Sequence, residues 1–282
     1  MTYQTFSLSV DDRIAHLQLN RPEAYNSLNR AFWHEFPEAV RALDVAAEAR
    51  VLVISSNGKH FSAGMDLEVF SKPDPELFNG EAGRRAEAMR RLVTQLQACF
   101  NVLEEIRMPV LTAVQGGCIG GALDLVCASD TRYCTEEAFF VVKETELGMT
   151  ADLGTLQRLP LLIPPGLARE LAYTARKFPA HEALASGLVN QVFPDPSTML
   201  DTVMDIARQI ASRSPLAVAG CKQMINYSRD HSMADSLDYM ATWQAGMFQP
   251  TDMMQTFAAK MSGEMPKFEP LRPITSPLKQ SR

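Results

Sequence analysis

The chain has 282 residues, 46% of them hydrophobic, and carries 27 Lys and Arg against 33 Asp and Glu, a net charge of −6. This length and apolar content exclude a disordered chain and suffice for a large core. The slight acidity disfavours nucleic acid as the main partner, because such binding rests on neutralising phosphates. The most apolar stretch, residues 110–129, is interrupted by four glycines and by Asp124, so we expect no membrane-spanning helix.

The cysteines, the histidines and the ends of the chain predict a reducing compartment and no metal. The five cysteines are scattered without CxxC spacing, and the five histidines form no ligand pattern such as HExxH. No basic segment precedes an apolar run at the start, and the last residues, KQSR, do not match a peroxisomal signal. We therefore expect a cytoplasmic protein without a structural or catalytic metal.

Hydrophobic periodicity predicts strands and helices in alternation over the first half of the chain. Alternation by two predicts a strand pair at 6–10 and 15–19, around an Asp-Asp turn. The elements expected after this pair are a helix over 32–43, a buried strand over 51–54, a helix over 87–106, a strand over 110–114, a helix near 123 and a strand over 133–142. This order is typical of an α/β domain with a largely parallel sheet.

The pattern changes near residue 199. Helical periodicity covers 200–210, 215–227 and 232–248 and reaches about residue 265, with no strand-like run. Residues 266–282 contain four prolines and are mostly polar, so we expect an extended tail there. The sequence thus predicts a core over 1–198, a helical segment over 199–265 and a tail.

Two glycine-containing turns each follow a predicted buried strand: FSAGMDL (61–67) and QGGCIGGALD (115–124). No GxSxG elbow, P-loop or GxGxxG motif is present. A turn that enters a helix leaves its first N–H groups unpaired, and two such groups aimed at one point would stabilise an oxyanion. Glycine-rich turns also serve simply to pack helix against sheet, and spacing alone does not decide between these interpretations.

Three carboxylates follow: Asp124, Glu144 and Asp152. Each has a structural interpretation, since Asp124 lies just inside a helix start, Glu144 closes an apolar strand and Asp152 is a candidate N-cap. Proton transfer at carbon needs carboxyl groups in an apolar pocket, where the neutral form is accessible near neutral pH. Their apolar neighbours in sequence make such a pocket possible, and the residues alone leave both interpretations open.

The FSAGMDL turn together with GGALDL (120–125) resembles the enoyl-CoA hydratase/isomerase, or crotonase, family. LNRP (19–22) and AYNSL (24–28) are similar to its N-terminal signature, and the likeness covers nearly the whole chain. The resemblance implies an α/β core built as a crotonase-like spiral of ββα repeats, with a C-terminal helical trimerisation segment. It also implies a homo-oligomer, either a trimer or a hexamer built as a dimer of trimers. No cofactor is implied beyond the CoA of the substrate.

The resemblance assigns roles at the two turns. In the family, two backbone N–H groups hold the carbonyl oxygen of an acyl-CoA thioester, and the matching positions are Met65 and Gly121. The strip that lines the CoA chain corresponds to Ala24, Ala63, Gly64, Met65, Asp66, Leu67 and Gly121. The chain departs from the family at Ala122, where a third consecutive glycine is common. A methyl group there is small enough to leave the hole intact.

The three acids make the likeness strongest to the dienoyl-CoA isomerase branch of the family. Hydratases carry two glutamates where this chain has Asp124 and Glu144, twenty positions apart, and a glycine where it has Asp152. RYCT (132–135) and LGTLQRLP (153–160) extend the likeness. This branch moves the double bonds of a 3,5-dienoyl-CoA to the 2,4 positions during β-oxidation of unsaturated fatty acids. By resemblance, Glu144 takes a proton from C2, Asp152 delivers one to C6 and Asp124 adjusts the polarity of the pocket.

Two alternatives remain open from the sequence. An enoyl-CoA hydratase would use Asp124 and Glu144 to add water, but Asp152 would then be superfluous and would crowd that water. A noncatalytic crotonase-fold protein would bind a partner or RNA. The low content of basic residues disfavours RNA binding. The presence of all three acids disfavours a noncatalytic protein.

Overall fold

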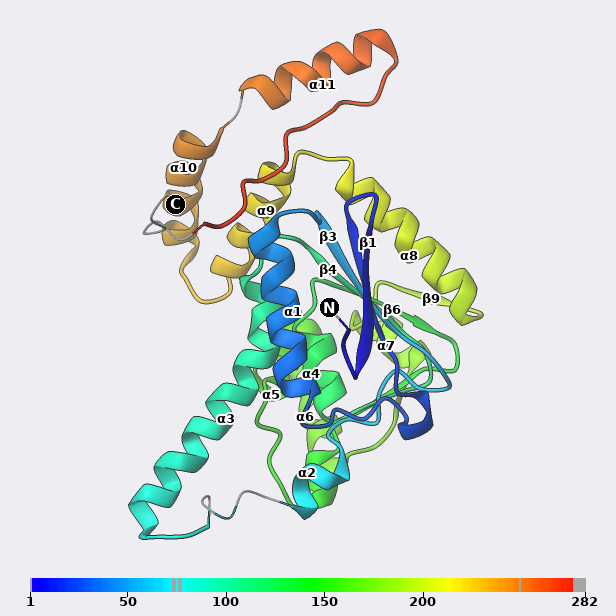
Figure 1. Cartoon of the computed structure of the whole chain (residues 1–282), viewed down its shortest axis with the longest axis vertical. Coiled ribbons are helices and arrows are strands. Elements are labelled where there is room, and N and C mark those ends of the chain that lie inside the picture. The colour runs from blue at the N-terminus through cyan, green and yellow to red at the C-terminus, as the bar shows by residue number, and fades with distance from the viewer. Residues whose placement is uncertain (1, 73–74, 76–77, 249, 276–282) are drawn as a thin grey trace.

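The computed structural model describes residues 2–72, 75, 78–248 and 250–275. Its core is a six-stranded sheet beside a small three-stranded sheet (Figure 1). The strands of the large sheet, in spatial order, are β1 (Phe6–Asp11), β2 (Ile14–Leu19), β3 (Val51–Ser56), β4 (Val110–Val114), β6 (Thr131–Thr135) and β9 (Gln191–Phe193). Those of the small sheet are β5 (Gly117–Ile119), β7 (Phe139–Val141) and β8 (Phe178–Pro179).

Helices connect the strands and then form the C-terminal part of the chain. Those of the first part are α1 (Phe32–Ala46), α2 (Leu67–Ser71), α3 (Ala82–Glu105), α4 (Gly121–Cys127), α5 (Thr155–Leu162), α6 (Pro165–Thr174) and α7 (Ala180–Ser186). Those of the last part are α8 (Pro196–Ala211), α9 (Pro215–Tyr227), α10 (Met233–Met247) and α11 (Pro250–Ser262).

The large sheet is antiparallel only at its first pair. β1 and β2 form the predicted hairpin, with Val10 opposite Ala15. β2, β3, β4, β6 and β9 then run parallel. All residues of β3 and β4 are buried, because helices cover both faces of these strands. The predicted α/β class with a largely parallel sheet is therefore confirmed.

The two faces of the sheet pack against different helices. Leu52 and Ile54 of β3 belong to the main core, which includes side chains of α1, α3 and α4. Val51 and Val53, which alternate with them, belong to a second cluster with Val203 of α8. Figure 1 shows α1 and α8 on opposite sides of the strands. This layered packing fixes the ends of β3 and β4, from which the two glycine-containing turns start.

The prediction of one strand over 133–142 is wrong. Residues 131–135 belong to the large sheet and residues 139–141 to the small one. A turn at the exposed residues Glu136 and Glu137 separates them, and the Glu136 N–H donates to the carbonyl of Phe193 in β9. Two adjacent charged side chains do not suit a strand buried on both faces. The break matters for the site, because β7 leads directly to Glu144.

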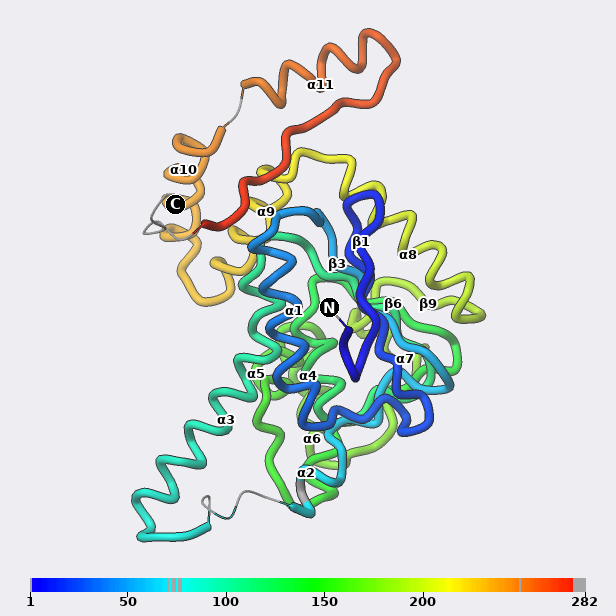
Figure 2. Tube along the Cα trace, viewed as in Figure 1, coloured from blue at the N-terminus to red at the C-terminus, as the bar shows by residue number. Residues whose placement is uncertain are grey.

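The C-terminal helices form as predicted. α9 is held to the core by buried Lys222, whose Nζ donates to the carbonyls of Leu103 and Met108. α10 has no buried residue among those described, and α11 buries only Ala259. In Figure 2 the chain runs outward through these two helices and returns along an extended segment. No helix of the described residues has the length and apolarity needed to cross a membrane.

The returning segment packs on the core. Residues 266–275 have no helix or strand, in line with the predicted extended tail. Arg50 donates to the carbonyl of Phe268 at 2.7 Å, and Arg107 donates to that of Arg272 at 3.1 Å. The rest of the predicted tail, 276–282, lies outside the described residues. The division at residues 198 and 265 stays a prediction.

Candidate active site

The FSAGMDL turn lies between the N-terminal signature segment and β5. On one side the Leu28 N–H donates to the carbonyl of Gly64 at 2.8 Å, and the Asp66 N–H donates to the carbonyl of Leu28 at 3.1 Å. On the other side the Ile119 N–H donates to the carbonyl of Ser62 at 3.1 Å. Backbone hydrogen bonds therefore hold both glycine-containing turns and the AYNSL segment side by side.

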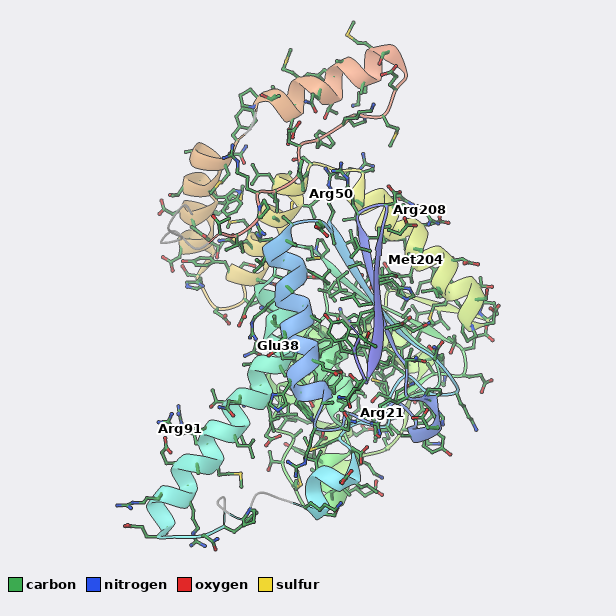
Figure 3. All side chains as sticks on the ribbon, in the orientation of Figure 1. Arg21, Glu38, Arg50, Arg91, Met204 and Arg208 are labelled. Carbon is green, nitrogen blue, oxygen red and sulfur yellow. The ribbon has the colours of Figure 1, made fainter. Side chains whose placement is uncertain are left out.

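Asp66 holds this arrangement together. Its carboxylate accepts a hydrogen bond from Ser27 Oγ at 2.8 Å and caps α2 by accepting from the Glu68 N–H at 3.0 Å. These two bonds, together with Arg21 at 3.4 Å, lower the pKa of Asp66. Arg21 is labelled in Figure 3 and lies in the loop region near α2. The structure thus gives Asp66 a role in fixing the turn, and its predicted contact with a CoA chain stays a prediction.

The other residues predicted to line the CoA chain lie in the FSAGMDL turn and in the AYNSL segment. Ala63 and Leu67 are exposed and Ala24 is half-buried. The Ala63 N–H donates to the carbonyl of Tyr25 at 2.9 Å, so the strip and the AYNSL segment share one surface. Within the strip, the exposed residues Ala63 and Leu67 flank the buried Gly64.

Met65 and Gly121 bring two backbone N–H groups close together. A Cβ built on Gly121 would lie 3.9 Å from Met65 N, and one built on Gly64 would lie 3.4 Å from Gly121 N. Neither N–H donates a hydrogen bond within the part of the chain that the structure describes. Gly64 has φ +84°, and a Cβ there would collide with the carbonyl oxygen of Ile119, so the turn needs glycine. The two donors suit a single oxygen atom that gains negative charge.

Glu144 lies against the second turn. It is the first residue of a 3₁₀ turn (Glu144–Leu147) just after β7, and its Oε1 is 3.2 Å from where a Cβ of Gly120 would stand. The other oxygen, Oε2, is buried and has no hydrogen-bond partner among the described residues. Burial, and after it the charge of Asp124, raise the pKa of Glu144 from 4.5 to about 7. This carboxyl group therefore changes charge near neutral pH.

Asp124 is buried most deeply of the three acids, with 1% of its surface exposed. Its Oδ1 accepts a hydrogen bond from the Thr155 N–H at 2.5 Å, whereas Oδ2 is buried without a partner among the described residues. Burial raises the pKa of Asp124 to about 6, although the hydrogen bond from Thr155 opposes this effect. Since its carboxylate accepts from the start of α5, Asp124 does not cap its own helix, α4.

Asp152 is half-buried and lies three residues before α5. The N-cap position of α5 is Gly154, which has φ +127°, so the interpretation of Asp152 as the N-cap is wrong. The carbonyl oxygen of Asp152 accepts from Gln97 Nε2 of α3 at 2.7 Å. Burial raises the pKa of Asp152, and its charge in turn raises the pKa values of Asp124 and Glu144. The three predicted acids are thus brought together and titrate as a coupled group.

The arrangement combines a site for a developing oxyanion with carboxyl groups that can exchange protons near neutral pH. A carbonyl oxygen held by Met65 N and Gly121 N would place its neighbouring carbon near Glu144, because Glu144 packs on the same turn. Stabilising the oxyanion lowers the barrier to removing a proton from that carbon. Among the described residues, no group of three His, Cys, Asp or Glu side chains is arranged to hold a metal ion.

Sequence reasoning missed the residues that support the acids. Thr155 donates its N–H to Asp124, and Gln97 holds the backbone of Asp152. Thr155 follows Gly154 within the LGTLQRLP segment, and a glycine with positive φ before a helix is a signal that could have found it. Gln97 gives no such signal, because it is one of several polar residues on α3.

The family model of enoyl-CoA hydratase/isomerase matches residues 10–266, so the chain belongs to this family. It is 46% identical to human "Delta(3,5)-Delta(2,4)-dienoyl-CoA isomerase, mitochondrial", over 89% of this chain and 77% of that protein. It is 41% identical to the Arabidopsis thaliana protein named "Delta(3,5)-Delta(2,4)-dienoyl-CoA isomerase, peroxisomal", over 96% of this chain and 99% of that protein. These relatives confirm the resemblance drawn from the sequence.

Solved structures agree with the family. An enoyl-CoA hydratase from Bacillus anthracis superposes with a TM-score of 0.85 at 28% identity, covering 94% of this chain and 99% of that one. A protein from Streptomyces coelicolor, described as a putative enoyl-CoA hydratase, superposes equally well, at 0.85, with 22% identity over 95% of each chain and supports the fold alone. The predicted crotonase-like fold with C-terminal helices is confirmed.

The predicted cytoplasmic location is contradicted by these relatives. The human and rat proteins are named as mitochondrial and the Arabidopsis protein as peroxisomal. The prediction rested on the first and last residues of the sequence. Such short address signals are read by receptors and leave no trace in the packing of the fold, so the folded chain gives no support for it either.

Proposed function

We propose that this chain is a Δ3,5-Δ2,4-dienoyl-CoA isomerase acting in the oxidation of unsaturated fatty acids. The observation that carries the proposal is the third acid: Asp152 caps no helix, lies half-buried and is coupled to Glu144. The names of the human and Arabidopsis relatives support the same activity. The substrate would be an acyl-CoA thioester whose chain carries double bonds at C3 and C5.

The thioester oxygen would be held by the N–H groups of Met65 and Gly121. The charge that develops when C2 loses its proton spreads over the thioester oxygen and the diene, and two preorganised donors stabilise it. Each such donor typically accounts for about 10²–10³ in rate. The thioester itself activates C2, so we propose that no metal or organic cofactor takes part.

Two acids would then move the double bonds. Glu144 removes a proton from C2, the electron pair moves through the diene, and Asp152 donates a proton to C6. The product is a 2,4-diene in which C2 is a CH group and C6 is a CH2 group. Glu144 has gained the proton from C2, and Asp152 has lost the proton that C6 received. Because C2 and C6 are four carbons apart, two acids along an elongated pocket suit the reaction. Asp124 adjusts the polarity around Glu144, whose pKa its charge raises.

Ala24, Ala63, Gly64, Asp66 and Leu67 would line the CoA chain together with the two donors. The exposure of Ala63 and Leu67 supports this role. We further propose that residues 1–198 bind and convert the substrate, whereas the helical segment 199–265 mediates homo-oligomerisation as a trimer or a dimer of trimers. Exposed methionines on α11, such as Met261 with 90% of its surface exposed, support an interface there.

The test is to mix the purified protein with a 3,5-dienoyl-CoA and to follow the ultraviolet spectrum. A 2,4-diene is conjugated with the thioester carbonyl, so its absorption band lies to the red of the substrate's. Growth of that band at a catalytic rate, lost in Asp152→Asn, is the expected result. Rapid hydration of a 2-enoyl-CoA without that band would favour the hydratase alternative, and no conversion of either substrate would favour a noncatalytic protein.

A further inference from the structure

A partly enclosed guanidinium group supports the loop that carries Asp152. Arg158 lies one turn into α5 and has 12% of its side-chain surface exposed. Its Nη2 donates to Asn101 Oδ1 at 2.6 Å and to Glu104 Oε2 at 2.7 Å, both on α3. One planar guanidinium group therefore joins α3 to the first turn of α5, with Nη2 making both hydrogen bonds.

The same guanidinium packs against the turn that lies between the acids. A Cβ built on Gly154 would collide with Nη1 of Arg158, and Gly154 has φ +127°. The arginine thus occupies the space that any other residue at position 154 would fill. Residues on either side of this glycine serve the site directly, since Asp152 is one of the acids and the Thr155 N–H binds Asp124.

A second side chain of α3 holds the same loop. Gln97 Nε2 donates to the carbonyl of Asp152 at 2.7 Å. The loop is therefore hydrogen-bonded to α3 through Gln97, and at the glycine it packs against Arg158, which is itself hydrogen-bonded to α3. The charge of Arg158 also reaches the site, because it is one of the groups that lower the pKa of Asp124.

We propose, on the basis of the function proposed above, that Arg158 is a positioning residue that fixes the 152–155 loop and so sets the places of Asp152 and Asp124. It touches neither acid in the way that a catalytic residue would touch substrate. Held by Asn101 and Glu104, it keeps Gly154 in its unusual conformation. That conformation aims the Thr155 N–H at Asp124 and sets where the Asp152 carboxyl group enters the pocket.

Arg229 provides a matched control. Its Nη1 donates to Glu104 Oε1 at 2.5 Å, so both arginines bind the same carboxylate. Arg229 follows the end of α9, and no hydrogen bond among the described residues joins it to the 152–155 loop. Replacing either arginine by methionine removes one positive charge from Glu104, but only the change at Arg158 removes the support under Gly154.

The experiment compares Arg158→Met, Arg229→Met and Arg158→Lys in the full chain. Hydrogen–deuterium exchange is followed in the peptide that contains Thr155, and kcat and KM are measured with a 3,5-dienoyl-CoA. In Arg158→Met we expect exchange at least about tenfold faster in that peptide and kcat at least about tenfold lower with KM little changed, because small displacements of reacting groups cost this much. Arg229→Met should leave both unchanged. Arg158→Lys, which keeps the charge without the planar group that fills the space beside Gly154, should fall between them.

Equal effects in Arg158→Met and Arg229→Met would overturn the proposal, because they would trace the loss to the shared Glu104 network. Unchanged exchange and kcat in Arg158→Met would also overturn it. If Arg158→Met does not fold, the lysine variant decides, since wild-type exchange and kcat there would contradict a positioning role for the guanidinium group. The exchange measurement needs no turnover, so it tests positioning even if wild-type protein does not isomerise the diene, an outcome that would refute the proposed function alone.

Discussion

Replacing Asp124 by asparagine is expected to stabilise the protein at and above neutral pH. Burial raises the pKa of Asp124 from 3.8 to about 6, so its ionised form is less stable in the folded protein than in the unfolded chain. The shift of about 2 units corresponds to roughly 3 kcal/mol of unfolding free energy lost once the group is ionised in both states. Asparagine keeps the shape and can still accept from the Thr155 N–H, although that weaker bond offsets about 1 kcal/mol.

The pH dependence gives this prediction its sign. The folded protein binds the Asp124 proton more tightly, so the favourable contribution of the neutral carboxyl group is complete below pH 3.8 and is lost as the pH rises through about 6. The advantage of Asp124→Asn should therefore be about 2 kcal/mol at pH 8 and smaller by about 1 kcal/mol at pH 5. For a chain of this size, 2 kcal/mol raises Tm by about 3 °C.

The assay is thermal unfolding at pH 5, 6, 7 and 8, at one protein concentration because the protein is expected to be oligomeric. Asp201→Asn, at an exposed position on α8, is the control for loss of a charge. An Asp124→Asn variant that is less stable than wild type at every pH would refute the reasoning. So would an advantage that grows toward acid pH.

Two further predictions concern the oxyanion site and the acids. Gly64→Ala should lower kcat/KM by about 100-fold or more, since the methyl group collides with the carbonyl of Ile119 and displaces the Met65 N–H. Met65→Ala, which keeps that N–H, should change kcat/KM little, and similar losses in steady-state assays of both variants would speak against a backbone donor. A pH profile of kcat/KM should be bell-shaped, because Glu144 must be ionised while Asp152 is protonated. The pair must therefore hold a single proton, and one limb of the bell should lie near pH 7, the raised pKa of Glu144. A profile that rises through pH 7 to a plateau would contradict the two-acid mechanism.

Much of the site follows from local sequence, because the two glycine-containing turns each follow a recognisable buried strand. The buried runs before FSAGMDL and QGGCIGGALD predict where the two turns lie, and the turns then place Met65 and Gly121. The resemblance to the family supplied the pairing of these two turns. Periodicity alone could not, since their contact depends on the bridge between Ser62 and Cys118, distant in sequence.

Other features depend on contacts that local patterns do not encode. Asp152 is a residue type that is common at N-caps, and the sequence does not show at which residue the next helix begins. In the structure the helix begins at Thr155 and its N-cap position is Gly154. The strand over 133–142 reads as continuous because the aromatic residues on both sides of Glu136 and Glu137 favour strands. The exposed glutamates mark the place where the chain passes from one sheet to the other.

The most direct test of the two-acid mechanism is a single turnover of 3,5-dienoyl-CoA in heavy water. Mass spectrometry or NMR then shows whether the hydrogen added at C6 of the product is deuterium or protium. If Glu144 removes the C2 proton and a separate acid, Asp152, supplies C6, the product carries deuterium at C6 because Asp152 exchanges with solvent before the substrate binds. Protium at C6, transferred from C2, would mean that one carboxyl group serves both carbons and would contradict the account.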